Sequence, residues 1–324
     1  MKAFNKQLTG SRMEKTEGAL VSILMNCYNG EKYLREAIES VLAQTFQNWE
    51  LIFWDNQSTD QSANIFKSYK DPRLKYFLSP EHTDLGGGRA KAFQHLTGEF
   101  IAILDTDDIW LPKKLEKQVP LFEDPEIGIV ISDTFFFNEK TEKALYGKKL
   151  PLTGSVFEKL MTNYFVSSET IVFRMSTALK LPRAFDHDFN FISDFDLVVR
   201  LSRISKMAFC PDVLAKWRVH GESHSWKYPL TFVEEKERWI MKQIAEDPSF
   251  SEIYKKQITI YNSTNYRERA VFQIRNNGSR VGAIQNVIKT RFIDWRDWIL
   301  LLLCLTPFSN IVLSYLYKSK AQII

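Results

Sequence analysis

Residues 101–108 read Ile101-Ala102-Ile103-Leu104-Asp105-Thr106-Asp107-Asp108, an apolar run that ends in three carboxylates interrupted by a single threonine. The apolar half is typical of a buried strand. Carboxylates this crowded need a cation, and hard ions such as Mg²⁺ and Mn²⁺ bind one or two protein carboxylates together with diphosphate oxygens. The stretch therefore predicts a metal–diphosphate site at a strand tip. The alternative is a solvated acidic turn, since aspartate is common in loops.

Short apolar runs alternate with amphipathic stretches around this segment, which is the pattern of βαβ units. The expected strands are 20–25, 49–54, 74–78 and 99–104, and the expected helices are 31–43, 60–69 and 89–96. Such alternation predicts an α/β fold, a mostly parallel sheet covered by helices, with ligands at the carboxyl ends of its strands. Polar residues follow three of these ends, so three loops are expected to converge on one edge.

The second half of the chain is more mixed. Expected strands at 127–132, 134–138 and 169–174 would extend the sheet in antiparallel fashion, and residues 231–288 look helical and charged. A helix expected over 192–205 carries Asp194 and Asp196 in its first turn, where acidic side chains also complement the helix dipole. The half after Leu150 is expected to carry specificity.

Composition excludes several classes of protein. The 324 residues are 44% hydrophobic and 14% aromatic, enough for one large domain or one domain with an appendage. The net charge of +4 is dispersed, which does not favour nucleic acid but suits anionic lipid or phosphorylated ligands. Cys27, Cys210 and Cys304 are odd in number and lack metal-ligand spacing, which favours a reducing compartment without disulfides or zinc. The first eighteen residues lack a secretory apolar run, so a flexible cytoplasmic N-terminus is expected.

The C-terminal tail differs from the rest of the chain. The twenty residues Trp298–Tyr317 are uncharged, and roughly 20 apolar residues can span a bilayer. Pro307, Ser309 and Asn310 interrupt this run. Three alternatives stay open: a kinked helix pair lying in the membrane interface, a transmembrane span, and a buried core helix. Basic residues flank the run on both sides: Arg291, Arg296, Lys318 and Lys320.

Several motifs in residues 20–226, taken in order, resemble the family 2 inverting glycosyltransferases of the GT-A type. They are Cys27-Tyr28-Asn29-Gly30, Trp54-Asp55-Asn56-Gln57-Ser58-Thr59-Asp60, Gly86-Gly87-Gly88-Arg89, Leu104-Asp105-Thr106-Asp107-Asp108, Ser193-Asp194-Phe195-Asp196-Leu197 and Trp217-Arg218-Val219-His220. Each motif is modest alone, but the ordered set is specific. The resemblance implies a GT-A fold, Rossmann-like, with a helical C-terminal extension, and a nucleotide-sugar donor.

The resemblance also implies which residues hold the nucleotide-sugar. Asp55 would accept a hydrogen bond from the imide N–H of uracil or thymine, and Asn29 would line the same base pocket. Arg89 would pair with phosphate oxygens in a glycine-rich turn before a helix, and Asp105 would meet the ribose. The structural alternatives are capping of the next helix by Asp55 and simple turn formation by Asn29-Gly30. An asparagine usually follows this arginine in the family, whereas this chain has Ala90.

Metal ligands are carried over in the same way. Asp107 resembles the direct ligand of Mn²⁺ or Mg²⁺, and Asp108 a second or supporting carboxylate. His220 resembles a histidine that reaches the metal or the diphosphate, although a lone histidine near a strand end is otherwise a polar surface residue. The metal would neutralise the charge that grows on the leaving nucleoside diphosphate.

An inverting transfer needs one general base to take the proton from the acceptor hydroxyl. Asp194 is the candidate, and Asp196 is the fallback, because positions i and i+2 of a helix point in different directions. In the family, a glutamate precedes this aspartate, whereas this chain has Ser193.

The expected domains are a flexible N-terminus (1–18), a catalytic domain (19–226) with a nucleotide-binding half (19–112) and an acceptor-side half (113–226), a helical extension (227–290) and a membrane-associated tail (291–324). The expected activity is metal-dependent transfer of a single sugar, most simply from a UDP-sugar, to a glycan or lipid-linked saccharide at the cytoplasmic face of the cell membrane. Bacterial surface-polysaccharide or lipopolysaccharide assembly is the setting that the resemblance implies.

Other classes of protein fit the sequence less well. The residues after the first strand lack both the G-x-G-x-x-G of dinucleotide-dependent oxidoreductases and the glycine-rich basic loop of sugar nucleotidyltransferases. A degenerate protein that binds a nucleotide-sugar or a membrane without turnover is compatible with Ala90 and Ser193. A processive polysaccharide synthase is a further alternative, although the chain has one apolar tail and only Trp217-Arg218 of a Gln-x-x-Arg-Trp motif.

Overall fold

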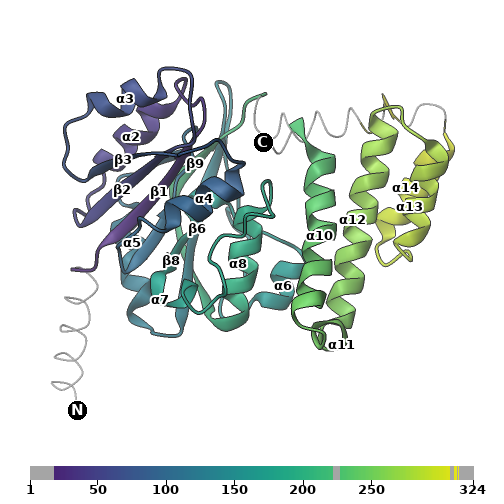
Figure 1. Ribbon diagram of the computed structural model, residues 1–324. Coiled ribbons are helices and arrows are strands. Elements are labelled where there is room, and N and C mark those ends of the chain that lie inside the picture. The colour runs from purple at the N-terminus through teal and green to yellow at the C-terminus, as the bar shows by residue number, and fades with distance from the viewer. Residues whose placement is uncertain (1–17, 222–226, 307–309, 312, 314–324) are drawn as a thin grey trace, which may run out of the picture. The chain divides into compact units, whose positions relative to one another are not determined.

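The structure is a computed structural model that describes residues 18–221, 227–306, 310–311 and 313. It divides into two compact units. Unit 1 comprises Met1–Phe157 and Phe165–Val219, and unit 2 comprises Glu158–Tyr164 and His220–Ile324. The flexible N-terminus predicted for residues 1–18 lies, except for its last residue, outside the described residues. Figure 1 shows the sheet of unit 1 and the helices of unit 2.

The first half of unit 1 is a parallel sheet, as predicted. Its strands β1 (Val21–Cys27), β2 (Trp49–Asp55), β3 (Leu74–Leu78) and β4 (Phe100–Ile103) lie in the order β3-β2-β1-β4. Every residue of β1 and β2 is buried, which explains why these strands read as continuous apolar runs. The register places Cys27 opposite Asp55, so the loops that follow β1 and β2 leave the sheet side by side.

The second half adds antiparallel pairs. β8 (Val172–Arg174) pairs antiparallel with β4 and with β6 (Ile127–Phe137), and β6 pairs parallel with β9 (Lys206–Arg218). The short strands β5 (Ile109–Trp110) and β7 (Glu142–Ala144) pair with β9 and β6. The antiparallel extension is therefore confirmed. The prediction of two strands over 127–138 is wrong, because β6 runs through both, and β9 was not predicted.

Helices cover both faces of the sheet (Figure 1). α2 (Leu34–Leu42) buries Leu34, Ala37, Ile38 and Val41, the i, i+3, i+4, i+7 positions of one face, in the same core as β1. α4 contacts β1 and β2, and α8 contacts β6. The helices of unit 1 in chain order are α2, α3 (Ser62–Ser68), α4 (Leu85–Phe93), α5 (Lys114–Gln118), η1 (Val119–Glu123), η2 (Ser168–Thr170), α7 (Met175–Ala178) and α8 (Ser193–Ile204).

Unit 2 is helical, as predicted for residues 231–288. After α6 (Phe157–Thr162), its helices are α10 (Pro229–Glu246), α11 (Phe250–Ile253), α12 (Lys255–Arg275), α13 (Arg280–Lys289) and α14 (Trp295–Leu305). A small core joins α12, α13 and α14 through residues such as Ile274, Val287 and Leu300. Arg267 of α12 also pairs with the buried Asp297 of α14 at 2.6 Å, which fixes the start of α14.

The apolar tail is only partly described. α14 covers its first residues, but most of 306–317 lies outside the described residues. Among the helices that the structure describes, none is long and apolar enough to cross a membrane. A span that used the remaining residues of the tail lies outside this description.

Candidate active site

The three loops predicted to meet at the sheet edge do meet. Asn29, after β1, accepts a hydrogen bond through Oδ1 from the Thr59 amide at 2.8 Å, and its own amide donates to Ser58 Oγ at 3.1 Å. A Cβ on Gly30 would lie 2.9 Å from Thr106 Oγ1, so the loops after β1 and β4 are also in contact. The candidate residues at these strand ends therefore share one site.

Asp55 is buried at the base of this site. Its Oδ1 accepts the Ser58 amide at 2.8 Å, and its Oδ2 accepts the Tyr76 hydroxyl of β3 at 2.6 Å. Burial, and then the hydrogen bond to Asp55, raises the pKa of Tyr76. Asp55 does not cap α3, where Asp60 Oδ1 instead accepts the Ser62 amide at 2.9 Å. The structure thus holds Asp55 in a fixed orientation and does not use it for the structural role considered above.

Two aromatic side chains that were not predicted as part of the site, Tyr28 and His82, lie beside Asn56, the residue after Asp55. The rings of Tyr28 and His82 are 4.2 Å apart between centroids, and His82 Nδ1 is 2.9 Å from the carbonyl oxygen of Asn56. Tyr28 is 51% exposed. Exposed aromatic faces of this kind can stack on a planar base. The signal available in the sequence was the position of Tyr28 between Cys27 and Asn29.

The acidic triplet is held by the end of β9. Asp108 is buried, and its Oδ1 accepts the Arg218 amide at 2.9 Å. The Arg218 side chain donates to the Asp107 carbonyl at 3.0 Å and to Glu36 Oε2 at 2.8 Å. Asp105 and Asp107 remain partly exposed. Arg218 therefore positions the loop that carries the acidic triplet, a role that the sequence did not reveal.

A further buried carboxylate, Glu169, raises the negative charge around the triplet. Burial first, and then the charges of Asp107 and Glu169, raises the pKa of Asp108 well above its usual value. Burial also raises the pKa of Glu169, against hydrogen bonds from the Ser167 hydroxyl at 2.7 and 2.9 Å that lower it. A cation would relieve this crowding, and the donors are all carboxylate oxygens. The residues present therefore fit Mg²⁺ or Mn²⁺.

The glycine-rich segment before Arg89 is not the turn that was predicted, because it forms the first part of a helix. Gly86, Gly87 and Gly88 lie within α4, and the amides at its start are already used: Asn190 Oδ1 accepts the Leu85 amide at 2.8 Å, and Asp84 Oδ1 accepts the Gly87 amide at 2.7 Å. Side chains therefore occupy two of the amides at the helix start, and the contact of Arg89 with phosphate stays a prediction.

Arg89 instead links the two sides of the site. Its side chain is 2% exposed, and it donates from Nη2 to Asp105 Oδ1 and from Nη1 to Ser193 Oγ, both at 2.7 Å. Ser193 is the first residue of α8, and Asp194 follows it with a partly exposed side chain. The buried guanidinium thus connects the acidic loop directly to the helix that carries the predicted base.

The two candidate bases differ in their surroundings. Asp196 is fully buried and forms an ion pair with Arg200, whose Nε lies 2.7 Å from Asp196 Oδ1. Arg200 also donates to the carbonyls of Arg183 and Ala184 at 2.6 and 2.8 Å, so this pair ties α8 to the preceding loop. The geometry therefore favours Asp194 as the carboxylate that can meet a substrate.

Comparisons with known proteins show the family of the chain. The family model described as Glycosyl transferase family 2 matches residues 22–181. An uncharacterized glycosyltransferase of Methanocaldococcus jannaschii is 31% identical over 208 residues, which are 62% of this chain and 71% of that protein. The chain belongs to glycosyl transferase family 2.

Two further known proteins are similar to this family 2 glycosyltransferase. The UDP-Glc:alpha-D-GlcNAc-diphosphoundecaprenol beta-1,3-glucosyltransferase WfgD of Escherichia coli is 28% identical, over 71% of this chain and 88% of that protein. The mannosyltransferase PcManGT of Pyrobaculum calidifontis, solved with GDP-Man and Mn²⁺, has a TM-score of 0.60 at 17% identity, over 94% of this chain and 86% of that chain. The structural match shows that the glycosyltransferase has the GT-A fold.

His220 is the one candidate site residue of the glycosyltransferase that unit 1 does not contain. It follows β9 by two positions and belongs to unit 2. Its role as a ligand stays a prediction. Within the described residues, Asp186, His187 and Asp188 are the one group of three potential ligands whose atoms all lie within 4.8 Å of one another, and the acidic triplet does not meet that spacing. Arg183 pairs with Asp186 at 2.5 Å, so a cationic side chain already balances the buried member of that group.

The loop that carries Asp186 packs tightly on α4, and this contact gives a first prediction. A Cβ on Gly86 would lie 2.0 Å from the Phe189 carbonyl oxygen, a backbone atom that cannot rotate away. We expect Gly86→Ala to lower the free energy of unfolding by about 2 kcal/mol, measured by urea denaturation. Gly221→Ala is the matched control, because a Cβ there meets nothing within 4 Å. Equal stability of the two variants would contradict the packing.

Proposed function

We propose that the protein transfers one sugar from a UDP-sugar to a hydroxyl of a lipid-linked saccharide or glycan, with inversion at the anomeric carbon. One observation carries the proposal: Arg89 bonds both Asp105, in the acidic loop, and Ser193, beside Asp194. The residues that would hold the donor and the residue that would activate the acceptor are thereby parts of one buried network.

The donor assignment rests on the pocket after β1 and β2. A carboxylate fixed by Ser58 and Tyr76, as Asp55 is, can accept the imide N–H of uracil. The Escherichia coli relative uses UDP-Glc by its name, while the Pyrobaculum mannosyltransferase was solved with GDP-Man. The fold therefore accepts different nucleotides, and we propose uridine because the Escherichia coli relative uses UDP-Glc by its name, with Asp55 as the acceptor of the imide N–H.

The proposed reaction is a single displacement. Asp194 takes the proton of the acceptor hydroxyl as its oxygen forms a bond to the anomeric carbon, while the bond from that carbon to the diphosphate oxygen breaks and UDP leaves with the electron pair. Asp107, with Asp108 in support, would hold Mn²⁺ or Mg²⁺, which stabilises charge on the diphosphate as a Lewis acid. Arg89 holds Asp105 and the start of α8 in fixed positions relative to each other.

The proposed acceptor and location follow from the relative and from unit 2. The Escherichia coli enzyme acts, by its name, on a sugar linked to diphosphoundecaprenol. In unit 2, α14 leaves large apolar side chains exposed, including Trp295 at 71% and Leu302 at 64%. We propose that residues 19–226 form the catalytic domain, that 227–290 form the helical extension, and that the tail from 291 contacts the cytoplasmic face of a membrane.

Calorimetric titration of the protein with UDP, GDP and dTDP, with Mn²⁺ present and then chelated, tests the proposal. We expect metal-dependent binding of UDP in preference to GDP, with the preference lost in Asp55→Ala. Binding of a nucleotide-sugar without any turnover on lipid-linked acceptors would instead favour the degenerate, non-catalytic alternative. The absence of nucleotide binding would overturn the proposed activity.

A further inference from the structure

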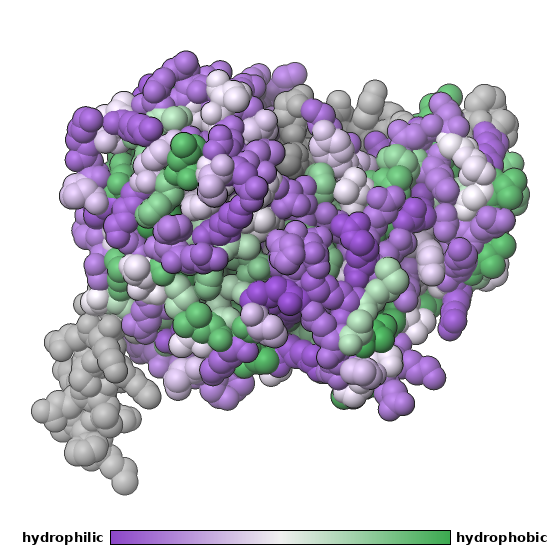
Figure 2. Space-filling view, in the orientation of Figure 1, coloured by the Kyte–Doolittle hydropathy of each residue, from purple (hydrophilic) through white to green (hydrophobic). Residues whose placement is uncertain are grey.

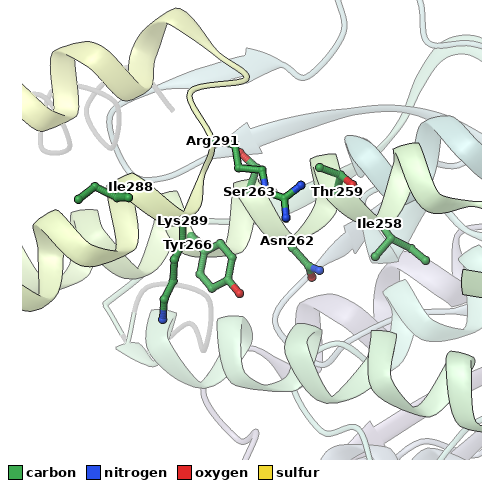
Figure 3. A pocket seen from close by; sticks show the side chains of 8 residues that line it. All are labelled: Ile258, Thr259, Asn262, Ser263, Tyr266, Ile288, Lys289 and Arg291. Atoms are coloured by element: carbon green, nitrogen blue, oxygen red, sulfur yellow. The ribbon is translucent and has the colours of Figure 1, made fainter.

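Unit 2 contains a cavity of about 340 Å³ that plays no part in the proposed reaction. It lies between α12 and the end of α13, with the turn to α14 closing one side (Figure 3). Most of its lining is polar or basic, and none of its lining residues is acidic: the polar ones are Thr259, Asn262, Ser263, Tyr266, Lys289 and Arg291. A cavity with this lining favours an anion.

The two cations are available to a ligand. Within the described part of the chain, neither Lys289 nor Arg291 has a carboxylate partner, although the neighbouring Arg267 and Arg296 both do. Lys289 Nζ lies 5.5 Å from the centroid of the Tyr266 ring, which keeps it at the cavity wall. Two unneutralised cations on one cavity attract a multiply charged anion such as a phosphate ester.

The buried hydroxyl of Ser263 independently indicates that the cavity holds a ligand. The residue is 3% exposed and lines the cavity, and its Oγ has no hydrogen-bond partner among the described residues. A buried hydroxyl without a partner is destabilising, so native structures rarely leave one unsatisfied. An oxygen of a bound phosphate would satisfy it.

The cavity adjoins an exposed apolar surface. Phe292, next to Arg291, stacks on Trp298 of α14 with ring centroids 4.2 Å apart. α14 turns Asp297, Leu300 and Cys304 inward. The opposite side of the helix carries the exposed face of α14, which consists of Trp295, Trp298, Ile299, Leu302 and Leu305. Figure 2 shows hydrophobic residues at the surface where Figure 1 places α13 and α14.

We propose that this cavity binds the phosphate group of an anionic membrane lipid whose hydrocarbon chain lies against the exposed face of α14. Charge complementarity selects the headgroup, and the adjoining tryptophan and leucine side chains suit the boundary between headgroups and acyl chains. The proposal rests on the membrane association within the proposed function, but not on sugar transfer. A polyprenyl phosphate and an acidic phospholipid share this chemistry.

Vesicle sedimentation with the full chain tests the proposal. Vesicles of phosphatidylcholine alone are compared with vesicles that also contain phosphatidylglycerol or a polyprenyl phosphate, and the two additions separate the two lipid sources. We expect the double variant Lys289→Gln, Arg291→Gln to bind either anionic vesicle about thirtyfold more weakly than the wild type, since each of the two cations contributes about fivefold to binding. The matched control is Lys255→Gln, Lys256→Gln, which removes two exposed cations of α12 outside the cavity lining and should retain binding.

Two further variants distinguish phosphate binding in the cavity from general binding of α14 to a membrane surface. Leu302→Ser should weaken binding to all vesicles, whereas Ser263→Ala should weaken binding only to anionic ones. Equal losses in the cavity and control variants would overturn the cavity site, as would tight binding of inorganic phosphate that vesicles do not compete for. Failure of the wild type to bind any vesicle would overturn the membrane association as well, while nucleotide titration would still report on the transferase.

Discussion

Asp107→Ala is expected to abolish metal-dependent binding of UDP and to lower the rate of sugar transfer by about 10³-fold, or about 4 kcal/mol of transition-state stabilisation. Asp107 is a partly exposed carboxylate of a loop in which Asp105 pairs with Arg89 and Asp108 accepts the Arg218 amide. Its loss removes the member of the triplet proposed as the first metal ligand. The leaving diphosphate would then carry its charge without the cation.

The measurement is calorimetric titration with UDP and Mn²⁺, followed by the rate of transfer under saturating donor. Asp188→Ala is the matched control, because Asp188 belongs to the other described group of potential ligands. We expect this control to bind UDP and Mn²⁺ as the wild type does. If Asp188→Ala lost metal dependence and Asp107→Ala kept it, the metal would belong to residues 186–188 and the proposed site would be wrong.

The parallel half of the fold was predictable because its strands are buried on both faces. β1 and β2 have no exposed residue, so they appear in the sequence as apolar runs ending at Cys27 and Asp55. Polar residues directly after such runs must lie at the carboxyl edge of a parallel sheet. This simple rule located Asn29, Asp55 and the acidic triplet without knowledge of any contact.

β9 and the full length of β6 were not predicted, because each contains residues that usually interrupt a strand. β9 contains Pro211 and Asp212, which read as a turn, and the pairing with β6 skips these two residues between Cys210 and Val213. Asp133 similarly suggested a break within β6. Its carboxylate accepts the Tyr146 and Gly147 amides at 3.0 and 3.1 Å, so the buried charge is solvated by backbone and the strand continues.

The start of α4 could not be predicted from propensity. Three consecutive glycines disfavour a helix by roughly 1 kcal/mol each. They are required for packing, because a Cβ on Gly86 would collide with the Phe189 carbonyl and one on Gly88 would lie 2.5 Å from Asn26 Oδ1. Close approach from distant parts of the chain sets this conformation. For the same reason, the hydrogen bond from Arg89 to Ser193 could not be predicted, because it joins residues 104 positions apart.

Asp194→Asn is expected to lower the turnover number by about 10³-fold while UDP binding and folding stay unchanged. The amide keeps the shape of the side chain but cannot take the acceptor's proton. Asp194 lies in the first turn of α8 and is partly exposed, so its side chain can meet an acceptor. Arg89 bonds the neighbouring Ser193, which the substitution does not touch.

Asp196→Asn separates this role from a structural one. Asp196 is fully buried against Arg200, and breaking a buried ion pair by removing one charge costs about 3–5 kcal/mol of stability. We therefore expect Asp196→Asn to unfold at lower denaturant concentration, whereas Asp194→Asn unfolds as the wild type and fails only in turnover. The loss in Asp194→Asn should appear in kcat rather than in KM for the donor, because the proton is transferred after binding. If Asp194→Asn kept its turnover and a folded Asp196→Asn lost it, the general base would be Asp196. The face of α8 that is buried here would then have to meet the acceptor.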